Sequence, residues 1–312
     1  MGKPIQRRQF ISTLTAAGIT LPLSKLRGHQ APKISSDYKP VICIFSKHLQ
    51  FLPNYQMMAE VAAEIGFDGV DLTVRPGGHV LPEDVEIDLP KAVKAIKEVG
   101  LKVPMIVTKI TDPEDPIAET ILRTAGELGI KYYRMGYLRF DEQLGVAKSL
   151  ENLKSKFAAL VGLNEKYNIV GTYQNHSGDR VGGPVWDLWE LLKDLDPNWI
   201  GCQYDIRHAT VEGAYSWPLG MDLLKSYIKT TAIKDFYWIK ENDQWKIKNC
   251  PLGDGMVDLK KYFTLYKKAH LSGPISMHFE YKHFSKSDTL QVKRKNTIKV
   301  MKKDLNTSRS II

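Results

Sequence analysis

Short apolar runs and longer amphipathic segments alternate along the chain from about residue 40 onward. The run 41–45 is apolar at every position, which is typical of a strand buried on both faces of a sheet. The longer segments place apolar residues every three or four positions, as in helices with one buried face. Several of them end at a glycine, including Gly66, Gly100 and Gly129, a residue that favours helix ends. The alternation predicts strand and helix in turn, and therefore a parallel sheet.

The pattern predicts eight strands with helices between them. Strands are expected at 41–45, 69–73, 103–108, 130–136, 169–176, 201–205, 231–236 and 274–280. Eight such units in about 270 residues fit a single (β/α)8 TIM barrel, an α/β fold, over residues 38–312. An open doubly wound sheet is disfavoured, because no G-x-G-x-x-G motif opens a helix.

Four local patterns refine this fold. Residues 236–247 alternate around Asn242-Asp243, which predicts a small hairpin outside the barrel. Residues 212–218 are expected to form an irregular segment that covers a pocket. Trp186 and Trp189 are expected to pack inward, because they belong to a helix with several leucines. The inward face of a closing helix after Ser287 is expected to consist of Leu290, Ile298, Met301 and Leu305.

The first 30 residues differ in composition from the rest. Arg7-Arg8 precedes the mildly apolar run 14–23, and no acidic residue occurs before Asp37. This order is typical of a twin-arginine leader, so we predict a leader over residues 1–30 and an exported, periplasmic protein. A disordered basic N-terminus is the alternative. The apolar run is too short and too interrupted to span a bilayer, and no Cys follows it, so no stable membrane anchor is expected.

The net charge of +9 is concentrated at the two ends of the chain. Residues 1–30 carry five Lys or Arg and no acid, and residues 282–312 carry nine against two. The body between them is slightly acidic, which argues against a nucleic-acid partner. The three cysteines are scattered without a C-x-x-C motif and imply neither a zinc knuckle nor a disulfide framework.

Polar residues gather where the predicted strands end. In a TIM barrel the carboxyl ends of all eight strands meet at one face, so these side chains are expected to share a pocket. The glycine-rich loop after the second strand contributes two of them, and every later strand end except the third contributes at least one. The residues expected to converge are Arg75, His79, Arg134, Gln174, His176, Asp205, His208, Lys234 and Glu280.

The pair Asp205 and His208 follows the sixth strand with the spacing D-x-x-H. A carboxylate and an imidazole at a strand end can hold a divalent metal or a sugar hydroxyl. An Asp that caps the following turn, beside a surface His, explains the same spacing without function. Similar polar strand ends elsewhere in the chain favour the functional interpretation.

These motifs resemble the xylose isomerase-like TIM barrels, the superfamily of sugar phosphate isomerases/epimerases and AP endonuclease family 2. The resemblance covers roughly residues 40–305. The segments that carry it are Tyr173-Gln174-Asn175-His176, Asp205-Ile206-Arg207-His208-Ala209, Ile233-Lys234-Asp235, Leu252-Gly253-Asp254-Gly255-Met256-Val257-Asp258 and His278-Phe279-Glu280.

The resemblance implies a divalent metal, Mn, Zn or Mg, bound by a Glu, an Asp, a His and a Glu of the late strands. Asp205 and Glu280 match the second and fourth positions. Gln174 stands in place of the first Glu, and Ala232 stands in place of the His. His176 or His208 could supply the missing nitrogen. The predicted ligands are Gln174, Asp205, His208 and Glu280.

The protein is expected to be an exported, metal-assisted enzyme that acts on a sugar, keto-sugar or glycoside. Glu280 is the predicted base, because the amide of Gln174 cannot exchange a proton. Lys234 or a histidine, His208 among them, is the predicted acid. One base disfavours two-base epimerisation and suits isomerisation, elimination or hydration. The predicted export favours the lyase or hydratase outcome slightly, because an exported enzyme meets glycosides more readily than free ketoses. The predicted substrate-binding residues are Arg75, His79, Arg134 and His176.

The alternative is a carbohydrate-binding barrel without catalytic activity, which the two substituted ligand positions favour. A nuclease is excluded, because the additional His and Glu ligands of a metal cluster and a basic face are missing. The expected partner is a small carbohydrate, and the sequence leaves open whether the protein is a homo-oligomer.

Overall fold

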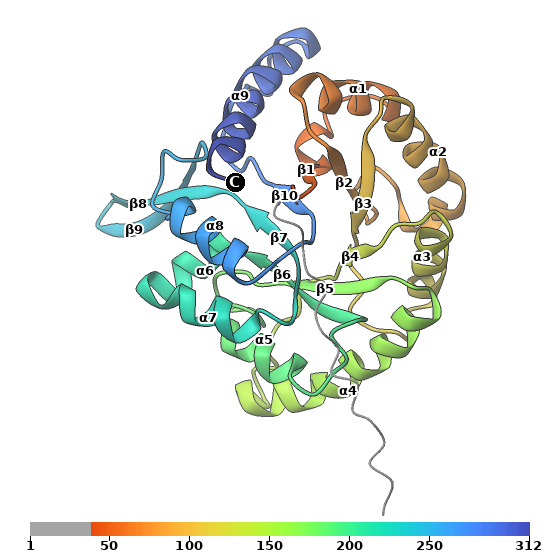
Figure 1. The fold of residues 1–312 in the computed structure, drawn as a ribbon, viewed down its shortest axis with the longest axis vertical. Coiled ribbons are helices and arrows are strands. Elements are labelled where there is room, and N and C mark those ends of the chain that lie inside the picture. Colours follow the sequence, from red (N-terminus) through yellow and green to blue (C-terminus); the bar gives the residue numbers. More distant parts are fainter. Residues whose placement is uncertain (1–38) are drawn as a thin grey trace, which may run out of the picture. The chain divides into compact units, whose positions relative to one another are not determined.

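The computed structural model describes residues 39–312, so the leader predicted over residues 1–30 lies outside the described residues. Eight parallel strands close into a barrel in the order β1-β10-β7-β6-β5-β4-β3-β2, and helices surround them (Figure 1). The predicted TIM barrel is therefore confirmed. The barrel strands are β1 (Ile42–Phe45), β2 (Gly69–Thr73), β3 (Lys102–Val107), β4 (Tyr132–Arg134), β5 (Val170–Gln174), β6 (Ile200–Asp205), β7 (Ile228–Ile233) and β10 (Ile275–Met277).

The helices follow the strands in the usual alternation. No helix within residues 39–312 combines the length and the apolar character that a membrane crossing requires. The helices are α1 (Tyr55–Ile65), α2 (Val85–Glu98), α3 (Pro116–Glu127), α4 (Gly145–Lys166), α5 (Val185–Leu192), α6 (Ile206–Gly213), α7 (Trp217–Leu224), α8 (Leu259–Lys268) and α9 (Leu290–Ile311), with the short 3-10 turns η1 (Ser46–Leu49), η2 (Pro82–Asp84) and η3 (Ala214–Ser216).

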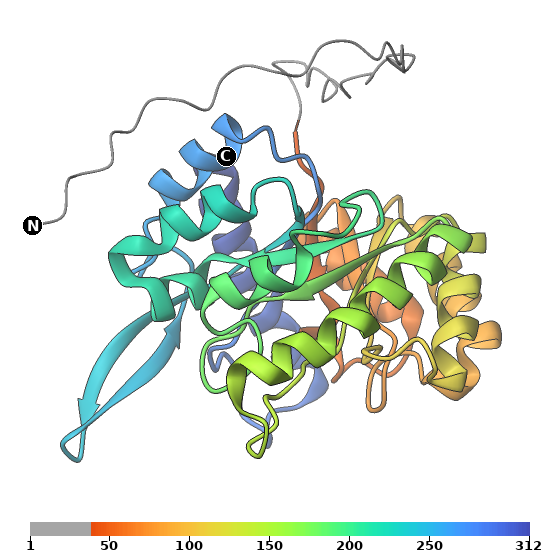
Figure 2. The same cartoon turned by 90° about the horizontal axis from the view of Figure 1, so that it is seen from below.

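The predicted hairpin is present as β8 (Asp235–Glu241) and β9 (Gln244–Cys250), and it projects away from the barrel (Figure 2). Its base is tied to the barrel by Asp235, whose carboxylate accepts hydrogen bonds from the backbone N–H groups of Gly253, Gly255 and Val257. The hairpin therefore leaves and rejoins the barrel at a fixed point, just after β7.

The prediction of an irregular segment over residues 212–218 is wrong. Helix α6 follows β6 without a gap and extends to Gly213, and α7 begins at Trp217. Between them Ala214 has a φ of 41°, which breaks the helix. Pro218 then lies in the first turn of α7, where its missing N–H costs nothing.

Two predicted inward residues are exposed. Trp186 is 55% exposed, because about 100° per residue places it on the side of α5 opposite Leu188. Trp189 is partly buried and packs on the core, as expected. In α9, Leu290 is 43% exposed, since the buried face of this helix begins only at Thr297. The other predicted positions, Ile298, Met301 and Leu305, pack on the core.

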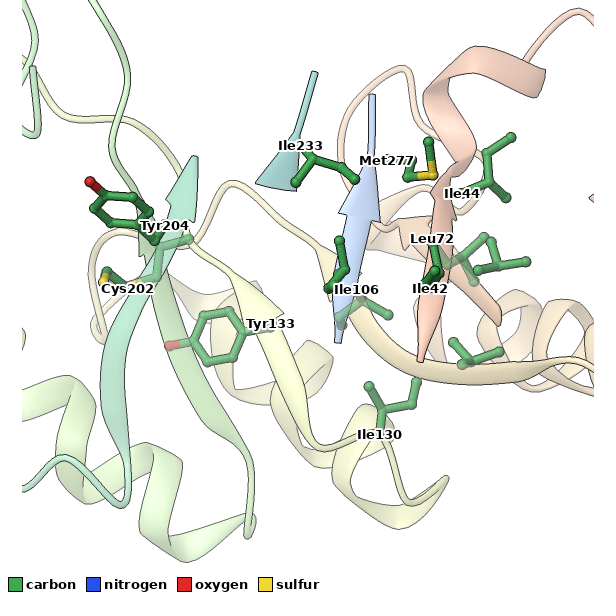
Figure 3. Close-up of a cluster of buried hydrophobic side chains, with 14 of the residues drawn as sticks. Ile42, Ile44, Leu72, Ile106, Ile130, Tyr133, Cys202, Tyr204, Ile233 and Met277 are labelled. Carbon is green, nitrogen blue, oxygen red and sulfur yellow. The ribbon is translucent and has the colours of Figure 1, made fainter. Parts of the chain in front are cut away.

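Strand register divides the barrel into an apolar outer layer and a polar interior. Residues opposite one another in register point to the same face. Asp205 lies opposite Ala232, which lies opposite Ser276. The Ser276 hydroxyl donates to Asp71 Oδ2 at 2.6 Å across the barrel, so this set faces inward. The alternate set packs between strands and helices and includes Ile44, Leu72, Ile106, Tyr133 and Tyr204 (Figure 3).

Asp71 is fully buried in this interior, and its Oδ1 has no partner within residues 39–312. Burial raises the pKa of Asp71 from its ordinary value to about 6, although the Ser276 hydroxyl and the charges of Arg134 and Arg75 oppose the shift. The folded protein therefore holds this proton more tightly than the unfolded chain does. Stability is lost as pH rises from the ordinary Asp pKa to about 6.

We expect Asp71→Asn to remove this loss. The difference in the free energy of unfolding, variant minus wild type, should be about 2 kcal/mol larger at pH 8 than at pH 4.5, so the variant gains stability relative to the wild type as pH rises. Urea denaturation of both proteins at the two pH values measures the difference. Asp179→Asn, at an exposed surface carboxylate, is the control and should show no such trend. An equal effect of Asp71→Asn at both pH values would contradict the expected titration.

Candidate active site

Asp205 is the centre of a hydrogen-bonded cluster at the carboxyl ends of the strands. Its Oδ1 accepts the backbone N–H of His208 at 3.1 Å, so Asp205 is the N-cap of α6. Its Oδ2 accepts Gln174 Nε2 at 2.8 Å and lies 2.9 Å from Lys234 Nζ. Asp205 is fully buried. The capping and the functional interpretation of the D-x-x-H spacing therefore both apply to this residue.

Gln174 is fixed in one orientation by its neighbours. Its Oε1 accepts hydrogen bonds from Arg134 Nη1 at 2.7 Å and from the Tyr137 hydroxyl at 2.5 Å. Its amide nitrogen faces Asp205, which can only accept. A glutamate here would present a second charge to Asp205, so the amide suits the position that it occupies.

His208 and Lys234 contact each other beside Asp205. His208 Nδ1 accepts the backbone N–H of Ser177 at 3.1 Å and lies 3.0 Å from Arg207 Nη1. Both are donors that cannot accept, so Nδ1 carries no proton and a neutral ring carries it on Nε2. His208 Nε2 lies 2.9 Å from Lys234 Nζ.

Burial shifts the titration of both groups toward their neutral forms. The pKa of His208 is lowered by burial and then by the charge of Lys234. The pKa of Lys234 is lowered by burial, although the charges of Asp205 and Glu280 oppose the shift. Proton transfer to and from such a lysine is easier near neutral pH than for an exposed one.

Glu280 lies on the loop after β10 and forms an ion pair with Lys47 of η1 at 3.2 Å. Burial would raise its pKa, but the charges of His48, Lys234 and Lys47 outweigh burial, so the pKa of Glu280 is lower than usual. The carboxylate is ionised at neutral pH, and its side chain is 28% exposed. Glu280 can therefore accept a proton from a molecule in the pocket.

Asn249 of β9 connects Glu280 to the central cluster. Its Oδ1 accepts Arg207 Nη2 at 2.8 Å, and its Nδ2 donates to the Glu280 backbone carbonyl at 3.4 Å. His176, the remaining histidine of the cluster, stacks on His208 with ring centroids 4.0 Å apart. The contacts thus form a continuous polar network across the late strands.

The structure places most of the predicted site residues in or beside this network. Arg134 joins it through Gln174, and Arg75 lies near Arg134 against the same aromatic ring, that of Phe45. His79 lies apart, at the rim. Its Nδ1 contacts the Thr73 hydroxyl at 3.0 Å, and burial lowers its pKa to about 4. It borders a hollow of about 620 Å³ lined by Gln50, Leu52, Pro53, Asn54, Tyr55, Gly77, Gly78 and His79.

Several residues of the network were not expected from the sequence. Arg207 lies inside the D-x-x-H spacing, and Tyr137 follows Arg134 by three residues, so their proximity to a strand end was a usable signal. Lys47, two residues after the end of β1, had the same signal, and Asn249 of the hairpin had none. Asn249 comes from the hairpin and Lys47 from the turn after β1, and only the closed barrel brings them to Glu280.

The residues present do not fit the divalent metal that the resemblance implies. Gln174 Oε1 already accepts two hydrogen bonds, and Ala232 offers no donor atom. The amino group of Lys234 lies within hydrogen-bond distance of both Asp205 and His208, where its nitrogen would compete with a cation. Within residues 39–312 no three His, Cys, Asp or Glu side chains form a metal-binding group. The predicted ligand set of Gln174, Asp205, His208 and Glu280 is therefore not assembled as a metal centre.

Comparison with known proteins gives a family and a set of similar folds. The sequence profile of the family described as xylose isomerase-like TIM barrel matches residues 59–306. No curated protein matches the chain in sequence. The structure of 3-keto-D-glucoside 4-epimerase from E. coli is similar with a TM-score of 0.64 and 15% identity, over 87% of this chain and 100% of that one.

Two further solved structures resemble the chain at similar distance. A xylose isomerase-like TIM barrel protein from Mycobacterium smegmatis, in complex with magnesium, has a TM-score of 0.60 and 14% identity, over 86% of this chain and 97% of that one. A probable 3-DHS dehydratase from Bacillus anthracis has a TM-score of 0.61 and 13% identity, over 85% and 97%. At such identities these likenesses show the fold alone.

We expect the wild-type protein, dialysed against EDTA, to take up no stoichiometric Mn²⁺, because Lys234 and Ala232 leave the donor set incomplete. The triple variant Gln174→Glu, Ala232→His and Lys234→Ala restores two ligands and removes the amine, and it should bind Mn²⁺ measurably. Isothermal titration with Mn²⁺ compares the two proteins. One tightly bound Mn²⁺ in the wild type would contradict this interpretation of the site.

Proposed function

Because this chain belongs to the xylose isomerase-like TIM barrel family, we propose that it is a sugar-converting enzyme of the isomerase or epimerase kind. Its proposed reaction begins with removal of a proton from the carbon next to a carbonyl. The observation that supports this most directly is the buried group of Asp205, Lys234 and His208, beside an ionised and partly exposed Glu280. An epimerase and a probable dehydratase are among the solved structures of similar fold.

The proposed roles depend on charge and position. Glu280 takes the proton from carbon, because it is ionised and accessible to a ligand. Lys234 gives a hydrogen bond or a proton to the carbonyl oxygen on which negative charge develops. Asp205 fixes the amine of Lys234, and His208 touches it on another side. Lys234 and Glu280 are close enough for each charge to influence the pKa of the other group.

Gln174 restricts the reaction after the first proton has been removed. It occupies the position of the family's first glutamate, and an amide cannot return a proton at working pH. Two-carboxylate epimerisation is therefore disfavoured. Isomerisation with one base, and elimination or hydration with Lys234 as the acid, need only the groups present. The lyase or hydratase outcome is a proposal, as is export of the protein, which depends on the Arg7-Arg8 motif alone.

A carbohydrate-binding barrel without catalytic activity is the second candidate. The observation that favours it is the substitution of two family ligand positions by Gln174 and Ala232. The two candidates differ in one measurable respect, since only the enzyme exchanges a carbon-bound hydrogen of its ligand with solvent.

We expect Lys234→Met and Glu280→Gln each to slow solvent exchange at a sugar carbon by about 10²–10⁴-fold, because each removes one partner in proton transfer. Proton NMR in D₂O, with a panel of keto-sugars and 3-keto-glycosides, identifies a substrate and measures the rate. Lys229→Met is the matched control, since Lys229 lies at the opposite end of β7 and bonds to the Ser226 carbonyl.

Thermal unfolding shows whether the variants remain folded. Wild-type exchange rates in both variants would contradict the assigned roles. A sugar that binds without any exchange in the wild-type protein would favour the binding barrel.

A further inference from the structure

The arginines of this protein form two groups that differ in their partners. Outside the candidate active site, every arginine that the structure describes forms an ion pair with a carboxylate: Arg123 with Glu86, Arg139 with Asp179, Arg294 with Glu64 and Arg309 with Asp68. At the site the opposite holds. Within residues 39–312, no carboxylate oxygen lies within 4.0 Å of Arg75, Arg134, Arg180 or Arg207.

The carboxylates of the site are already used by lysines. Glu280 pairs with Lys47, and Asp205 pairs with Lys234. Asp71 lies deeper in the barrel and bonds to the Ser276 hydroxyl, and with a pKa of about 6 it supplies one negative charge near neutral pH. The positive charge of the four guanidinium groups is therefore only partly balanced by the described part of the protein.

Three of these guanidinium groups surround two aromatic rings. Arg75 and Arg134 lie 5.6 and 5.4 Å from the ring centre of Phe45. Arg134 and Arg180 each lie 5.2 Å from the ring centre of Tyr137. The arginines come from β4 and from the loops after β2 and β5, at the carboxyl end of the barrel. The rings hold the planar groups by cation–π contact, which does not use their N–H edges.

The N–H edges of the three groups are largely without acceptors in the described part of the chain. Arg134 is 4% exposed, and its Nε is buried without a partner, while its Nη1 bonds to Gln174. Arg75 and Arg180 stack on the rings, and no side-chain hydrogen bond joins either of them to residues 39–312. For the buried Nε of Arg134 an unmade hydrogen bond is costly, whereas Arg75 and Arg180 are partly exposed and their N–H groups face solvent or a ligand.

Arg207 differs from the other three because its partners are neutral. It donates to Asn249 Oδ1 at 2.8 Å and lies near Ser177 and His208. Its terminal nitrogens have partners, its Nε is buried without one in the described part of the chain, and its charge adds to the positive field. A guanidinium presents two parallel N–H groups that match the oxygens of a carboxylate or phosphate.

We infer that the pocket binds a sugar derivative that carries an oxyanion group, a carboxylate or a phosphate, and that Arg75, Arg134 and Arg180 hold this group. The word sugar in this inference rests on the proposed function, whereas the anionic group rests on the arginines alone. A neutral sugar would leave the charges unbalanced and the N–H edges unused. The substrate is accordingly a sugar acid or a sugar phosphate.

Binding of matched ligands tests the inference without any need for turnover. Isothermal titration compares D-glucuronate, D-glucose 6-phosphate and D-glucose, which share a skeleton and differ in charge, and inorganic phosphate tests the anion alone. We expect the anionic sugars to bind about tenfold or more tightly than glucose. The first two ligands distinguish a carboxylate from a phosphate. Equal or tighter binding of glucose, or no binding of any anionic probe at millimolar concentration, would overturn the inference.

Arginine variants test which residues bind the anionic group of the ligand. Arg75→Gln and Arg180→Gln should each reduce the affinity for the preferred anionic ligand about tenfold or more and change the affinity for glucose by a smaller factor. Arg123→Gln, on the outer surface of α3, is the matched control and should change neither. An unchanged anion preference in both site variants would overturn the assignment to these residues.

Failure of this inference is distinguishable from failure of the proposed function. Solvent exchange on a neutral keto-sugar without any anion preference would leave the proposed function intact and contradict the inference. Arginine-dependent anion binding without exchange on any sugar would support the inference and contradict the proposed function.

Discussion

The buried carboxylate of Asp205 joins three strands whose site residues are far apart in the sequence. It ends β6, starts α6 by capping its first turn, and accepts from Gln174 of β5 and from Lys234 beyond β7. A buried carboxylate is stable only when its oxygens are occupied by donors. Asp205 meets this condition with groups from neighbouring elements, so the geometry of the site and the geometry of the barrel depend on each other.

The polar interior of the barrel is subject to the same requirement, that buried polar groups have hydrogen-bond partners. Strand alternation turns one set of residues toward the helices, where apolar side chains form the core, and the other set toward the barrel axis. The inward set includes Asp71, Gln174, Asp205 and Ser276, which are joined in pairs by the Ser276–Asp71 and Gln174–Asp205 hydrogen bonds. The apolar layer provides the stability that allows a polar centre, and positively charged residues surround the mouth of that centre. In this arrangement the amine of Lys234 lies within hydrogen-bond distance of both Asp205 and His208.

Much of the fold could be predicted because its signals are local. The second strand was predicted with the bounds that the structure gives it, and the hairpin around Asn242-Asp243 is present. The errors occur where local patterns are ambiguous. The segment 212–218 contains Gly213, Tyr215 and Pro218, which suggest a loop, but a capping aspartate and a proline at N1/N2 make two short helices instead. Trp186 was misplaced because hydrophobicity alone does not give the side of a helix.

By itself, the sequence determined that the chain forms a (β/α)8 barrel and that Asp205, His208, Lys234 and Glu280 stand at strand ends, since both depend on periodicity and on position along the chain. It also determined the amide at position 174 and the alanine at position 232. Only the tertiary structure decided which groups touch. That the amine of Lys234 lies between Asp205 and His208, that Asn249 links Arg207 to the Glu280 backbone, and that four arginines have no carboxylate partner within residues 39–312 are facts of distance between residues tens to hundreds of positions apart. Closure of the barrel sets these distances, because the strand register fixes which inward side chains share a level and no local pattern encodes that register.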